Sequence, residues 1–427
     1  MKGIPVVKSK LIMPQLSNSF IRLERIKKLS KAMHNPSVVT ITAPAGYGKT
    51  TLMVAALNMY PLDHRICWYR LEQEDRDLAV FYAHFIEALF PAGEKSWADS
   101  GSYLADCGDI HSQHQYLNAL ICQELWAFHE HHKKIKTFIV LDDFQQVKDS
   151  PEIFGSVRYL INNLPENCSI FVSSRSQTDM LTAKNKLEKD FLEISSEELC
   201  FSEEELAEFL GEVYGIKANK KFVQKIMSNT EGWAAGIIMI CQALGKCSLQ
   251  GMGSLLEKSG DKDLLFKYFA LEVLKTVDSQ LMLFLVKAAL LREFTAAEAG
   301  AVLNVENVLQ LLAQCEKKGL FIQKVVGEVT TYRFHGLFRD VLLQAQPEYL
   351  TAEEIENYHL KAAACYIESR FFNRAIEHFI ACGNVPPAVD LITRESVNLI
   401  TLEAFEQLRL WFKLLPGEVV NNNAILL

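Results

Sequence analysis

The sequence predicts an α/β domain, in which a parallel sheet is covered by helices on both faces, followed by a part that is almost entirely helical. Two observations support this division. Up to about residue 200, four short apolar runs of buried-strand length alternate with helix-compatible stretches, which is the rhythm of a parallel sheet. Beyond residue 200 such runs disappear, except for one pair around Val326-Gly327-Glu328.

The four apolar runs define the predicted sheet. The first, VVTITA at 38–43, is rich in β-branched residues and leads through the turn APAGYGKTT into the helix-compatible stretch LMVAALNMY. The others are ICWYRL at 66–71, TFIVLD at 137–142 and SIFVSS at 169–174. The polar stretch PAGEKSWADSGSYLADCGD at 91–109 contains Gly and Ser and is predicted to be a surface loop.

The helical part begins with FSEEELAEFLGEVYG at 201–215. Ser202 is predicted to cap this helix, and Glu205 to complete a capping box. Residues 263–341 are predicted to form three or four helices that end in two short β-runs, and helices closed by a hairpin indicate a winged helix. From residue 351 onward, Ala and aromatic residues have helix-hairpin spacing, which indicates the start of a helical-repeat region.

The composition indicates a globular, acidic protein. Of the 427 residues, 49% are hydrophobic and 22% are charged, which is enough to build cores and excludes disorder as the main state. Lys and Arg number 44 against 52 Asp and Glu, so the net charge is −8. The chain is therefore poorly suited to wrap nucleic acid by itself, because phosphate binding needs a basic face.

Cysteine usage and the N-terminus predict a cytoplasmic protein. Ten cysteines without a C-x-x-C pair fit reduced, mostly buried thiols better than a disulfide framework. The N-terminus lacks the apolar core of a signal peptide, and the most apolar stretch, at 281–291, is short and interrupted by charge, so no membrane segment is predicted. The chain stops at NNNAILL while a helical pattern is running, and we expect it to be a fragment of a longer protein.

The strongest chemical signal is the sequence APAGYGKT at 43–50, which follows a predicted strand and opens a helix, as a phosphate-binding loop requires. Its glycines let backbone N–H groups point at the β-phosphate, Lys49 is expected to reach the β- and γ-phosphates, and the Thr50 hydroxyl is expected to bind Mg²⁺. Ala43 replaces the first glycine of the pattern, and the alternative is a chance glycine turn. The α/β domain is thus predicted to be a P-loop NTPase. The residues predicted to bind nucleotide here are Ala45, Gly46, Tyr47, Gly48, Lys49, Thr50 and Thr51.

Two neighbouring strand ends add charged groups. The strand at 137–142 ends in two carboxylates, as is usual in P-loop NTPases. Asp142 is predicted to hold Mg²⁺ through water, and Asp143 to orient the attacking water. Arg175 follows the next strand and is predicted to sense or stabilise the γ-phosphate. The alternatives are a solvated Asp pair in a turn and a surface arginine.

An ordered set of motifs resembles the MalT-like branch of the LuxR-type transcriptional regulators, in the STAND class of P-loop signalling ATPases. The set covers nearly the whole chain. Its members, in order, are SKLIMPQL with Arg22-Leu23-Glu24-Arg25-Ile26, PAGYGKTTL, CWYRLEQEDRD, FIVLDDFQQV, FVSSR, LCFSEEE, EGWAAG, LLREFTAAEAGAVLN, KKGLFIQ, YRFHGLFRDVLL and AIEHFIACGNVPPAVDLI.

This resemblance implies five domains, with ADP or ATP and Mg²⁺ between the P-loop domain and the winged helix. The implied divisions are an N-terminal segment that closes on the nucleotide at 1–36, the P-loop NTPase domain at 37–200, an all-α lid at 201–262, the winged helix at 263–345, and a helical region at 346–427 that begins a TPR-like sensor or arm.

Three residues acquire roles through the resemblance alone. Arg22 is similar to the arginine of the N-terminal segment that closes over the adenine side. Trp233 lies in Gly232-Trp233-Ala234, where many relatives carry Gly-x-Pro against the base, and Ala234 replaces that proline. His335 resembles the winged-helix histidine that touches the β-phosphate of ADP in the resting state, and its alternative is a core or hydrogen-bonded histidine.

The resemblance also implies a switch. ADP held by both domains stabilises a closed form, whereas ATP, with an inducer that is a small molecule or a protein, favours an open form that self-associates. Hydrolysis is expected to be slow. In the family a C-terminal helix-turn-helix binds DNA, and we expect this domain and the full sensor to lie beyond residue 427.

Other readings of the sequence remain open. An enzyme that uses ATP continuously, such as a remodelling ATPase, is disfavoured because we find no second phosphate-binding loop and no obvious arginine-finger motif in the sequence. A scaffold with an empty site is disfavoured by the intact site residues. DNA binding by the winged helix itself is disfavoured because residues 263–345 carry nine Lys or Arg against nine Asp or Glu. The run His129–Lys134 is predicted to be a solvated helix end rather than a metal site.

Overall fold

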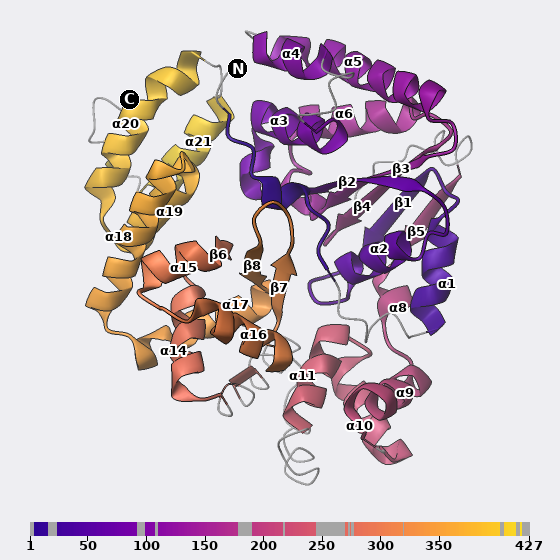
Figure 1. Ribbon diagram of the computed structural model, residues 1–427, viewed down its shortest axis with the longest axis vertical. Coiled ribbons are helices and arrows are strands. Elements are labelled where there is room, and N and C mark those ends of the chain that lie inside the picture. Colours follow the sequence, from indigo (N-terminus) through magenta and orange to yellow (C-terminus); the bar gives the residue numbers. More distant parts are fainter. Residues whose placement is uncertain are drawn as a thin grey trace.

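The structure, a computed structural model, is organised as a P-loop domain, a helical lid, a winged helix and a helical arm (Figure 1). The chain passes from the P-loop domain through the lid to the winged helix and then along the arm, whose helix α21 returns to the P-loop domain near η2 (Gln73–Arg76). The described residues are 4–15, 24–91, 99–106, 110–177, 190–216, 218–244, 270–271, 274, 277–318, 320–401, 405–415 and 419–420.

Five parallel strands form the sheet of the P-loop domain, in the order β2-β3-β4-β1-β5. Four of them confirm the predicted apolar runs to within two residues, whereas the sequence does not predict β5, which is short and only partly buried. Because β4 lies between β1 and β3, one strand separates the phosphate-loop strand from the acidic strand. The bounds are β1 Val38–Thr42, β2 His64–Arg70, β3 Lys136–Asp142, β4 Cys168–Ser174 and β5 Phe191–Ile194.

Helices cover both faces of this sheet, as predicted. Alternate side chains of a strand point to opposite faces, so β1 places Val39 and Ile41 in the core shared with α2 and Val38 in the core shared with α3, α5 and α6. The fold class, a parallel sheet with helices on both faces followed by a mostly helical part, is therefore confirmed. The helix bounds are α1 Glu24–Met33, α2 Lys49–Asn58, α3 Leu78–Leu89, α5 Ile110–His131 and α6 Pro151–Asn162.

The predicted surface loop at 91–109 is wrong for its central part, which forms helix α4 (Asp99–Asp106) packed on α3 and α5. Ser100, at the start of α4, is fully buried, and its backbone N–H donates to a carboxylate oxygen of Glu124 on α5 at 2.8 Å. The partner that fixes this helix therefore comes from another element, which the polar composition of the stretch does not reveal. Residues 92–98 and 107–109 lie outside the described residues.

The lid consists of three helices and a short turn of helix before them. The predicted capping box is present at the start of α9, where the Glu205 N–H donates to the Ser202 hydroxyl and the Glu205 carboxylate accepts from the Ser202 N–H. Gly215 ends this helix in the left-handed conformation. The bounds are α8 Ser196–Leu199, α9 Glu203–Tyr214, α10 Lys220–Thr230 and α11 Ala234–Leu244.

The winged helix follows the predicted pattern of helices closed by a hairpin. Its three strands form one antiparallel sheet in the order β6-β8-β7, and the hairpin points towards the N-terminal segment (Figure 1). At the hairpin tip, a Cβ on Gly327 would lie 2.1 Å from the side chain of Ile12, so the wing tip contacts that segment. The bounds are α14 Ser279–Ala288, β6 Phe294–Thr295, α15 Ala296–Leu303, α16 Val308–Lys318, β7 Ile322–Val325, β8 Thr331–Phe334 and α17 Gly336–Tyr349.

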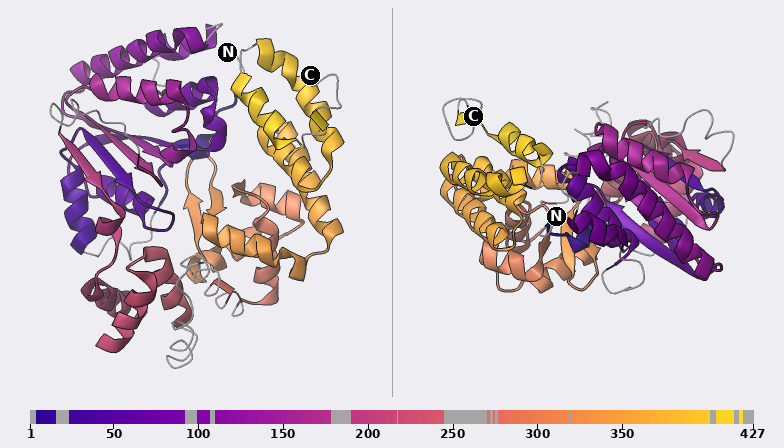
Figure 2. Two further views of the ribbon diagram at one scale, coloured as in Figure 1. Left: turned by 180° about the vertical axis from the view of Figure 1, so that it is seen from behind. Right: turned by 90° about the horizontal axis from the view of Figure 1, so that it is seen from above.

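Four consecutive helices form the arm, which lies beside the winged helix and the P-loop domain in both further views (Figure 2). Neighbouring arm helices pack on each other in sequence order, as in the predicted start of a helical array. No helix within the described ranges combines the length and the apolar composition that crossing a membrane requires. The bounds are α18 Ala352–Glu368, α19 Phe372–Ala381, α20 Val385–Thr401 and α21 Phe405–Leu414.

Two left-handed glycines of the lid allow a matched test of close packing. Gly232 has a φ of +80°, and a Cβ there would lie 2.6 Å from the backbone oxygen of Phe201, whereas Gly215, with a φ of +67°, has no atom within 4 Å of its would-be Cβ. Each alanine substitution costs left-handed strain of roughly 1–2 kcal/mol, but only Gly232→Ala adds a backbone clash. We expect Gly232→Ala to lower the thermal unfolding midpoint by several degrees more than Gly215→Ala does. Equal midpoints would contradict the close approach.

Candidate functional site

The phosphate loop has the geometry that its sequence predicts. It leaves β1 at Ala43 and enters α2 at Lys49, and both of its glycines adopt positive φ, +79° at Gly46 and +88° at Gly48. Ala43 is not among the described residues with positive φ, so an alanine fits where the usual pattern has its first glycine. The Ala43 N–H donates to the Ser174 backbone oxygen at 3.1 Å, which joins the loop to β4.

Lys49 is folded back against this loop. Its Nζ donates to the backbone oxygens of Ala43 at 2.7 Å and Pro44 at 3.1 Å, and only 7% of the residue is exposed. Burial lowers the pKa of Lys49, and the opposing effects of Asp143 and Asp142 only partly offset it. The cation is thus held at the loop by weak neutral acceptors, and an anionic phosphate would replace them with a stronger partner.

The Thr50 hydroxyl meets Asp142 across the site. Its Oγ1 lies 3.0 Å and 3.2 Å from the two carboxylate oxygens of Asp142, whose residue is 1% exposed. The Ser173 hydroxyl, at the end of β4, donates to the same carboxylate, and so does the Asp143 backbone N–H at 3.2 Å. Three elements are therefore joined through one buried carboxylate.

This carboxylate fits a magnesium ion. Burial, followed by the neighbouring Asp143, raises the pKa of Asp142 to about 6, so its ionised form is less favoured than in water and a bound cation would stabilise it. Thr50 and Asp142 together offer the hydroxyl and carboxylate oxygens that Mg²⁺ takes when phosphates supply the rest of its ligands. Among the residues that the structure describes, no group of three or more His, Cys, Asp or Glu is arranged to hold a metal by itself. The residues present fit Mg²⁺ bound together with a nucleotide.

Asp143 and Arg175 are joined through the side chain of Gln145, which the sequence analysis did not assign to the site. Asp143 adopts a left-handed φ of +61°, and its backbone N–H donates to the Ser173 hydroxyl at 3.0 Å. The Gln145 side-chain amide donates to Asp143 Oδ1 at 2.8 Å and accepts from the Arg175 backbone N–H at 3.0 Å. The motif FIVLDDFQQV contains Gln145, and its position two residues after Asp143 is the signal that could have identified it.

Trp233 of the lid packs against the phosphate loop. The residue is 2% exposed, and its Nε1–H donates to the Ala45 backbone oxygen at 3.0 Å. The Ala235 N–H donates to the Gly46 backbone oxygen at 3.0 Å, and a Cβ on Gly46 would lie 2.7 Å from both Trp233 Nε1 and the Ala235 side chain. The lid thus packs directly on the loop. A contact of Trp233 with an adenine base stays a prediction.

His335 brings the winged helix to the same place. It caps the N-terminus of α17, and its backbone N–H donates to the Phe321 oxygen at 2.8 Å. Burial lowers the pKa of His335 to about 4, and the charges that act on it come from Arg175, Asp143 and Lys49. The winged-helix histidine therefore lies close enough to the phosphate-site residues of the other domain for their charges to act on it, although the two are far apart in sequence.

The remaining residues predicted to bind nucleotide are Tyr47, Thr51 and Arg22. Tyr47 is partly buried and packs against the core, and Thr51 is partly buried on the first turn of α2. Arg22 lies outside the described residues. The prediction of a solvated helix end at 129–134 is wrong for His129, which is 6% exposed with Nε2 3.0 Å from Cys168 Sγ, because the end of α5 packs on β4. None of the eight described cysteines is paired in a disulfide.

A second charged cluster lies at the end of β2, where four segments of the chain meet. Lys10 is fully buried, and its Nζ lies 3.1 Å from Asp75 and 3.3 Å from Glu72. Glu72 also pairs with Arg70 at 3.0 Å and with Arg374 of α19 at 3.6 Å.

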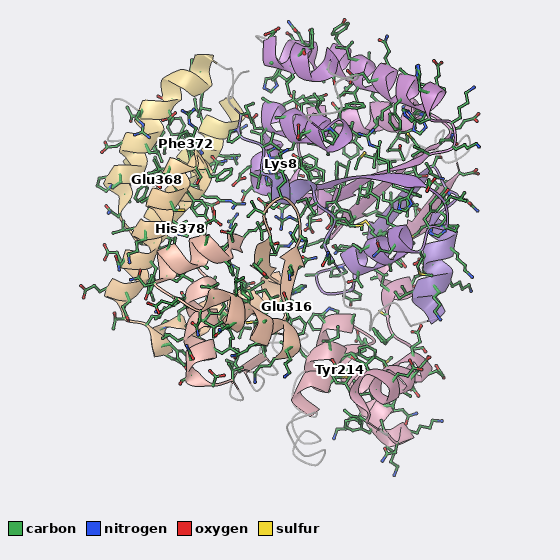
Figure 3. The ribbon with its side chains drawn as sticks, viewed as in Figure 1. Lys8, Tyr214, Glu316, Glu368, Phe372 and His378 are labelled. Carbon is green, nitrogen blue, oxygen red and sulfur yellow. The ribbon has the colours of Figure 1, made fainter. Side chains whose placement is uncertain are left out.

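The winged helix joins this cluster through Glu293, which pairs with Arg70. Lys8 lies nearby and pairs with Glu87 of α3 at 2.8 Å (Figure 3). Because Arg70 is in register with Asp142 of the adjacent strand, the cluster sits one strand away from the phosphate site.

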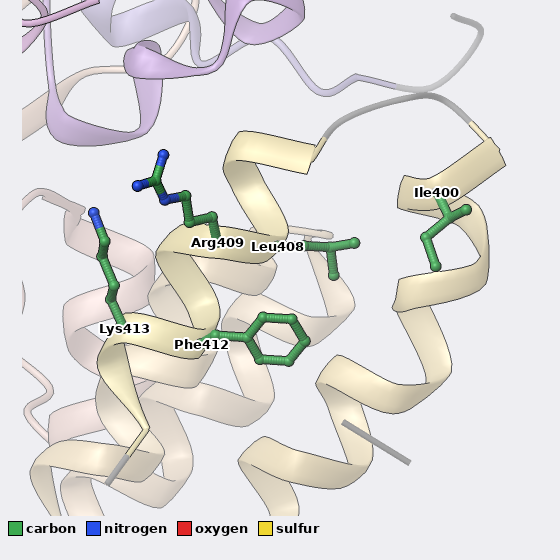
Figure 4. Close-up of a pocket in the computed structure, with 5 residues that line it drawn as sticks. All are labelled: Ile400, Leu408, Arg409, Phe412 and Lys413. Carbon is green, nitrogen blue, oxygen red and sulfur yellow. The ribbon is translucent and has the colours of Figure 1, made fainter. Parts of the chain in front are cut away.

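The arm contains a groove of about 580 Å³ between α20 and α21. Leu408 and Phe412 point towards Ile400, whereas Arg409 and Lys413 point to the other side of α21 (Figure 4). None of these residues belongs to the phosphate site or to the cluster around Glu72.

Two family descriptions match parts of the chain. Residues 32–176 match the AAA domain, and residues 270–353 match the MalT winged helix domain. The chain thus combines an AAA domain with a MalT winged helix domain. The narrower assignment to LuxR-type regulators stays a prediction.

Curated relatives and a solved structure resemble the chain over nearly its whole length. The serine/threonine-protein kinases PknK of Mycobacterium tuberculosis and Mycobacterium bovis are 25% identical over 413 residues, which are 96% of this chain and 36% of theirs. The crystal structure of a Signal Transduction ATPase with Numerous Domains (STAND) protein with a tetratricopeptide repeat sensor, from Pyrococcus horikoshii, matches with a TM-score of 0.62 at 15% identity, covering 96% of this chain and 56% of that one. The chain therefore shares its fold with that solved protein, and it spans only part of the length of the proteins it matches.

The lowered pKa of His335 predicts a pH dependence of stability. The unfolded chain binds a proton on His335 near its ordinary pKa of about 6.5, whereas the folded chain binds it only near 4, so the folded form loses stability as pH falls through this window. We expect the thermal unfolding midpoint of His335→Asn to fall less than that of wild type between about pH 7.5 and about pH 5. The largest possible difference corresponds to one proton fewer taken up on unfolding. The exposed His131 is the control, and His131→Asn should leave the slope unchanged. An unchanged slope in His335→Asn would contradict the burial of its ring.

Proposed function

We propose that this chain is the nucleotide-operated switch of a signalling protein of the STAND type. ADP is held between the P-loop domain and the winged helix in a closed resting form. ATP, together with an inducer that is a small molecule or a protein, drives an open form that self-associates. The protein acts in the cytoplasm and hydrolyses ATP slowly, as a timer for the switch rather than as a metabolic enzyme.

The observation that carries this proposal is the position of His335. A P-loop domain that only hydrolyses ATP has no need of a winged-helix histidine within reach of the charges of Lys49, Asp143 and Arg175. A nucleotide bound at the loop would touch both domains, so its phosphates determine how well the two domains fit together. ATP and ADP differ in the γ-phosphate, and a ligand shifts an equilibrium only through such differential contacts.

Each site residue then has a role. The loop at 45–51 binds the phosphates, with Lys49 moving from its backbone acceptors to the β- and γ-phosphates. Thr50 and Asp142 hold Mg²⁺, which neutralises charge on the phosphates when bound. Asp143 orients the attacking water, and Arg175 responds to the γ-phosphate. Arg22 and Trp233 contribute to the adenine side.

The output of the switch lies outside this chain. The resemblance to LuxR-type regulators favours transcription control, through a DNA-binding domain beyond residue 427. The curated relatives are named as serine/threonine-protein kinases, and this chain spans 36% of their length. A kinase output is therefore the second candidate. A remodelling ATPase and a nucleotide-free scaffold are the alternatives for the chain itself.

The test is to denature the purified protein and identify the released nucleotide by ion-exchange chromatography. Stoichiometric ADP would support the closed resting switch. Without bound nucleotide, titration of ADP and ATP by thermal shift is the second step, because ligand at a hundred times its Kd stabilises by about 2.7 kcal/mol. No bound nucleotide and no shift would favour the scaffold, and fast steady turnover would favour the remodelling enzyme.

Lys49→Ala tests the assignment of the phosphate loop. Removal of the cation leaves the phosphates without their main partner, so the stabilisation of about 2.7 kcal/mol by saturating nucleotide should disappear. Thermal shift with and without ADP measures this. Lys221→Ala, at an exposed position of α10, is the control and should keep the full shift. Unchanged binding by Lys49→Ala would contradict the site.

Asp143→Asn separates hydrolysis from binding. The amide keeps the shape of the side chain but is a poor base, so single-turnover hydrolysis should slow on the order of a hundredfold or more. The Kd for ATP should stay within about threefold, because Asp143 is placed to act on water rather than on Mg²⁺. Asp149→Asn, at an exposed position beyond the same turn, should behave as wild type. Hydrolysis by Asp143→Asn at the wild-type rate would overturn this role.

A further inference from the structure

Gln145 occupies a position that nothing in the proposed mechanism yet uses. It lies in the turn η3 (Phe144–Gln146), directly after the acidic strand β3. Its Nε2 is 2.8 Å from Asp143 Oδ1, and its Oε1 is 3.0 Å from the backbone nitrogen of Arg175. One side chain thus connects the carboxylate at the end of β3 with the residue that follows β4.

The chemistry of the two partners fixes the orientation of this amide. A backbone N–H can only donate, so the atom facing Arg175 must be the carbonyl oxygen. The NH₂ group is then left to face Asp143, whose ionised carboxylate only accepts. The reversed amide would lose both bonds, so Gln145 has one satisfied orientation, and it occupies one oxygen of Asp143 while leaving Oδ2 to other partners.

The turn that carries Gln145 is held rigidly against β4. Phe144 is fully buried, and the Asp143 backbone is held in its left-handed conformation by a bond to Ser173 Oγ. Further along, Lys148 Nζ donates to Ser176 Oγ at 3.0 Å. These bonds fix the backbone of Asp143. Among the described contacts, only Gln145 holds its carboxylate on the side of Arg175.

We propose that Gln145 is the positioning residue that sets the carboxylate of Asp143 for the attacking water and couples it to the backbone of Arg175. This inference rests on the proposed function, because it assigns a role in ATP hydrolysis. Gln145 touches neither the phosphate loop nor Lys49 in the described contacts, so it acts through Asp143. The bond to the Arg175 backbone N–H anchors the Gln145 amide, which in turn holds the carboxylate of Asp143.

The step that Gln145 supports is a balanced hydrolysis. The water oxygen forms a bond to the γ-phosphorus while the bond between that phosphorus and the β,γ-bridging oxygen breaks. Asp143 accepts the proton that the water loses, and ADP leaves with inorganic phosphate as the second product. Displacing the carboxylate by about 1 Å lowers the rate of such a step on the order of a hundredfold.

Gln145→Met tests the role by removing both hydrogen bonds while keeping the side-chain length. Single-turnover hydrolysis should slow on the order of tenfold to a hundredfold, while the KM for ATP and the thermal shift with ADP stay within about threefold. Gln146→Met is the matched control, because the described hydrogen bonds of that neighbour involve only its backbone, and it should hydrolyse ATP as wild type does.

Gln145→Glu gives a readout that a merely structural role would not move. Its ionised carboxylate would still accept from the Arg175 N–H but would repel Asp143. Its protonated form donates one O–H and accepts through the other oxygen, as the amide does. The two like charges raise the pKa of the pair, which takes up one shared proton and regains the hydrogen bond, so the rate of Gln145→Glu relative to wild type should rise as pH falls from about 8 to about 6. The same ratio for Gln145→Met should stay flat.

The outcomes are separable. A wild-type rate in Gln145→Met, or a ratio for Gln145→Glu that does not change with pH, would overturn the positioning role and leave the proposed switch intact. Wild-type protein that neither binds nucleotide nor hydrolyses ATP would overturn the proposed function, and this inference with it. If Gln145→Met fails to fold, the pH profile of Gln145→Glu decides by itself.

Discussion

The buried carboxylate of Asp142 is the constraint around which the phosphate site is built. A carboxylate that is 1% exposed is costly unless several donors surround it, and here the donors come from the start of α2, the end of β4 and the turn after β3. Satisfying that one group fixes three elements relative to each other. The loop, the acidic strand and the strand that leads to Arg175 therefore meet at one edge of the sheet, where a nucleotide and a cation complete the set.

The arrangement of the domains depends on a second charged group, the partly buried Glu72. It pairs with Lys10 of the N-terminal segment, Arg70 of β2 and Arg374 of the arm, and Arg70 in turn pairs with Glu293 of the winged helix. The two clusters belong to adjacent strands, since Arg70 and Asp142 are in register. Whatever moves the winged helix relative to the phosphate site therefore also changes the surroundings of Arg70.

Local signals in the sequence were sufficient where the chain is regular. Apolar runs predict the strands at 38–42 and 136–142, glycines predict the phosphate loop, and Ser202 with Glu205 predicts a helix cap. In each case the signal lies within a few positions of the chain. The signals failed where a distant partner decides. Glu124 turns the polar stretch at 99–106 into a helix, and packing on β4 buries His129.

The same limit explains what was missed in the site. Gln145 belongs to a motif of the sequence, but its role depends on a hydrogen bond from the Arg175 N–H after the next strand. Residue spacing does not predict that bond. The pairing of Arg70 with Glu293 joins residues from two domains. Residue type predicts which groups need a partner, whereas the fold decides which partner each group receives.

The shared carboxylate of Glu72 also limits how this protein can change over generations. A substitution that removes Glu72 alone leaves the buried Arg374 without its described ion-pair partner, and breaking a buried pair in this way costs about 3–5 kcal/mol. Loss of Glu72 by a single replacement is therefore selected against, and we expect it together with a change at position 374. Lys10 near one end of the chain and Arg374 near the other both pair with Glu72, so one carboxylate connects selection at two positions that are far apart in sequence.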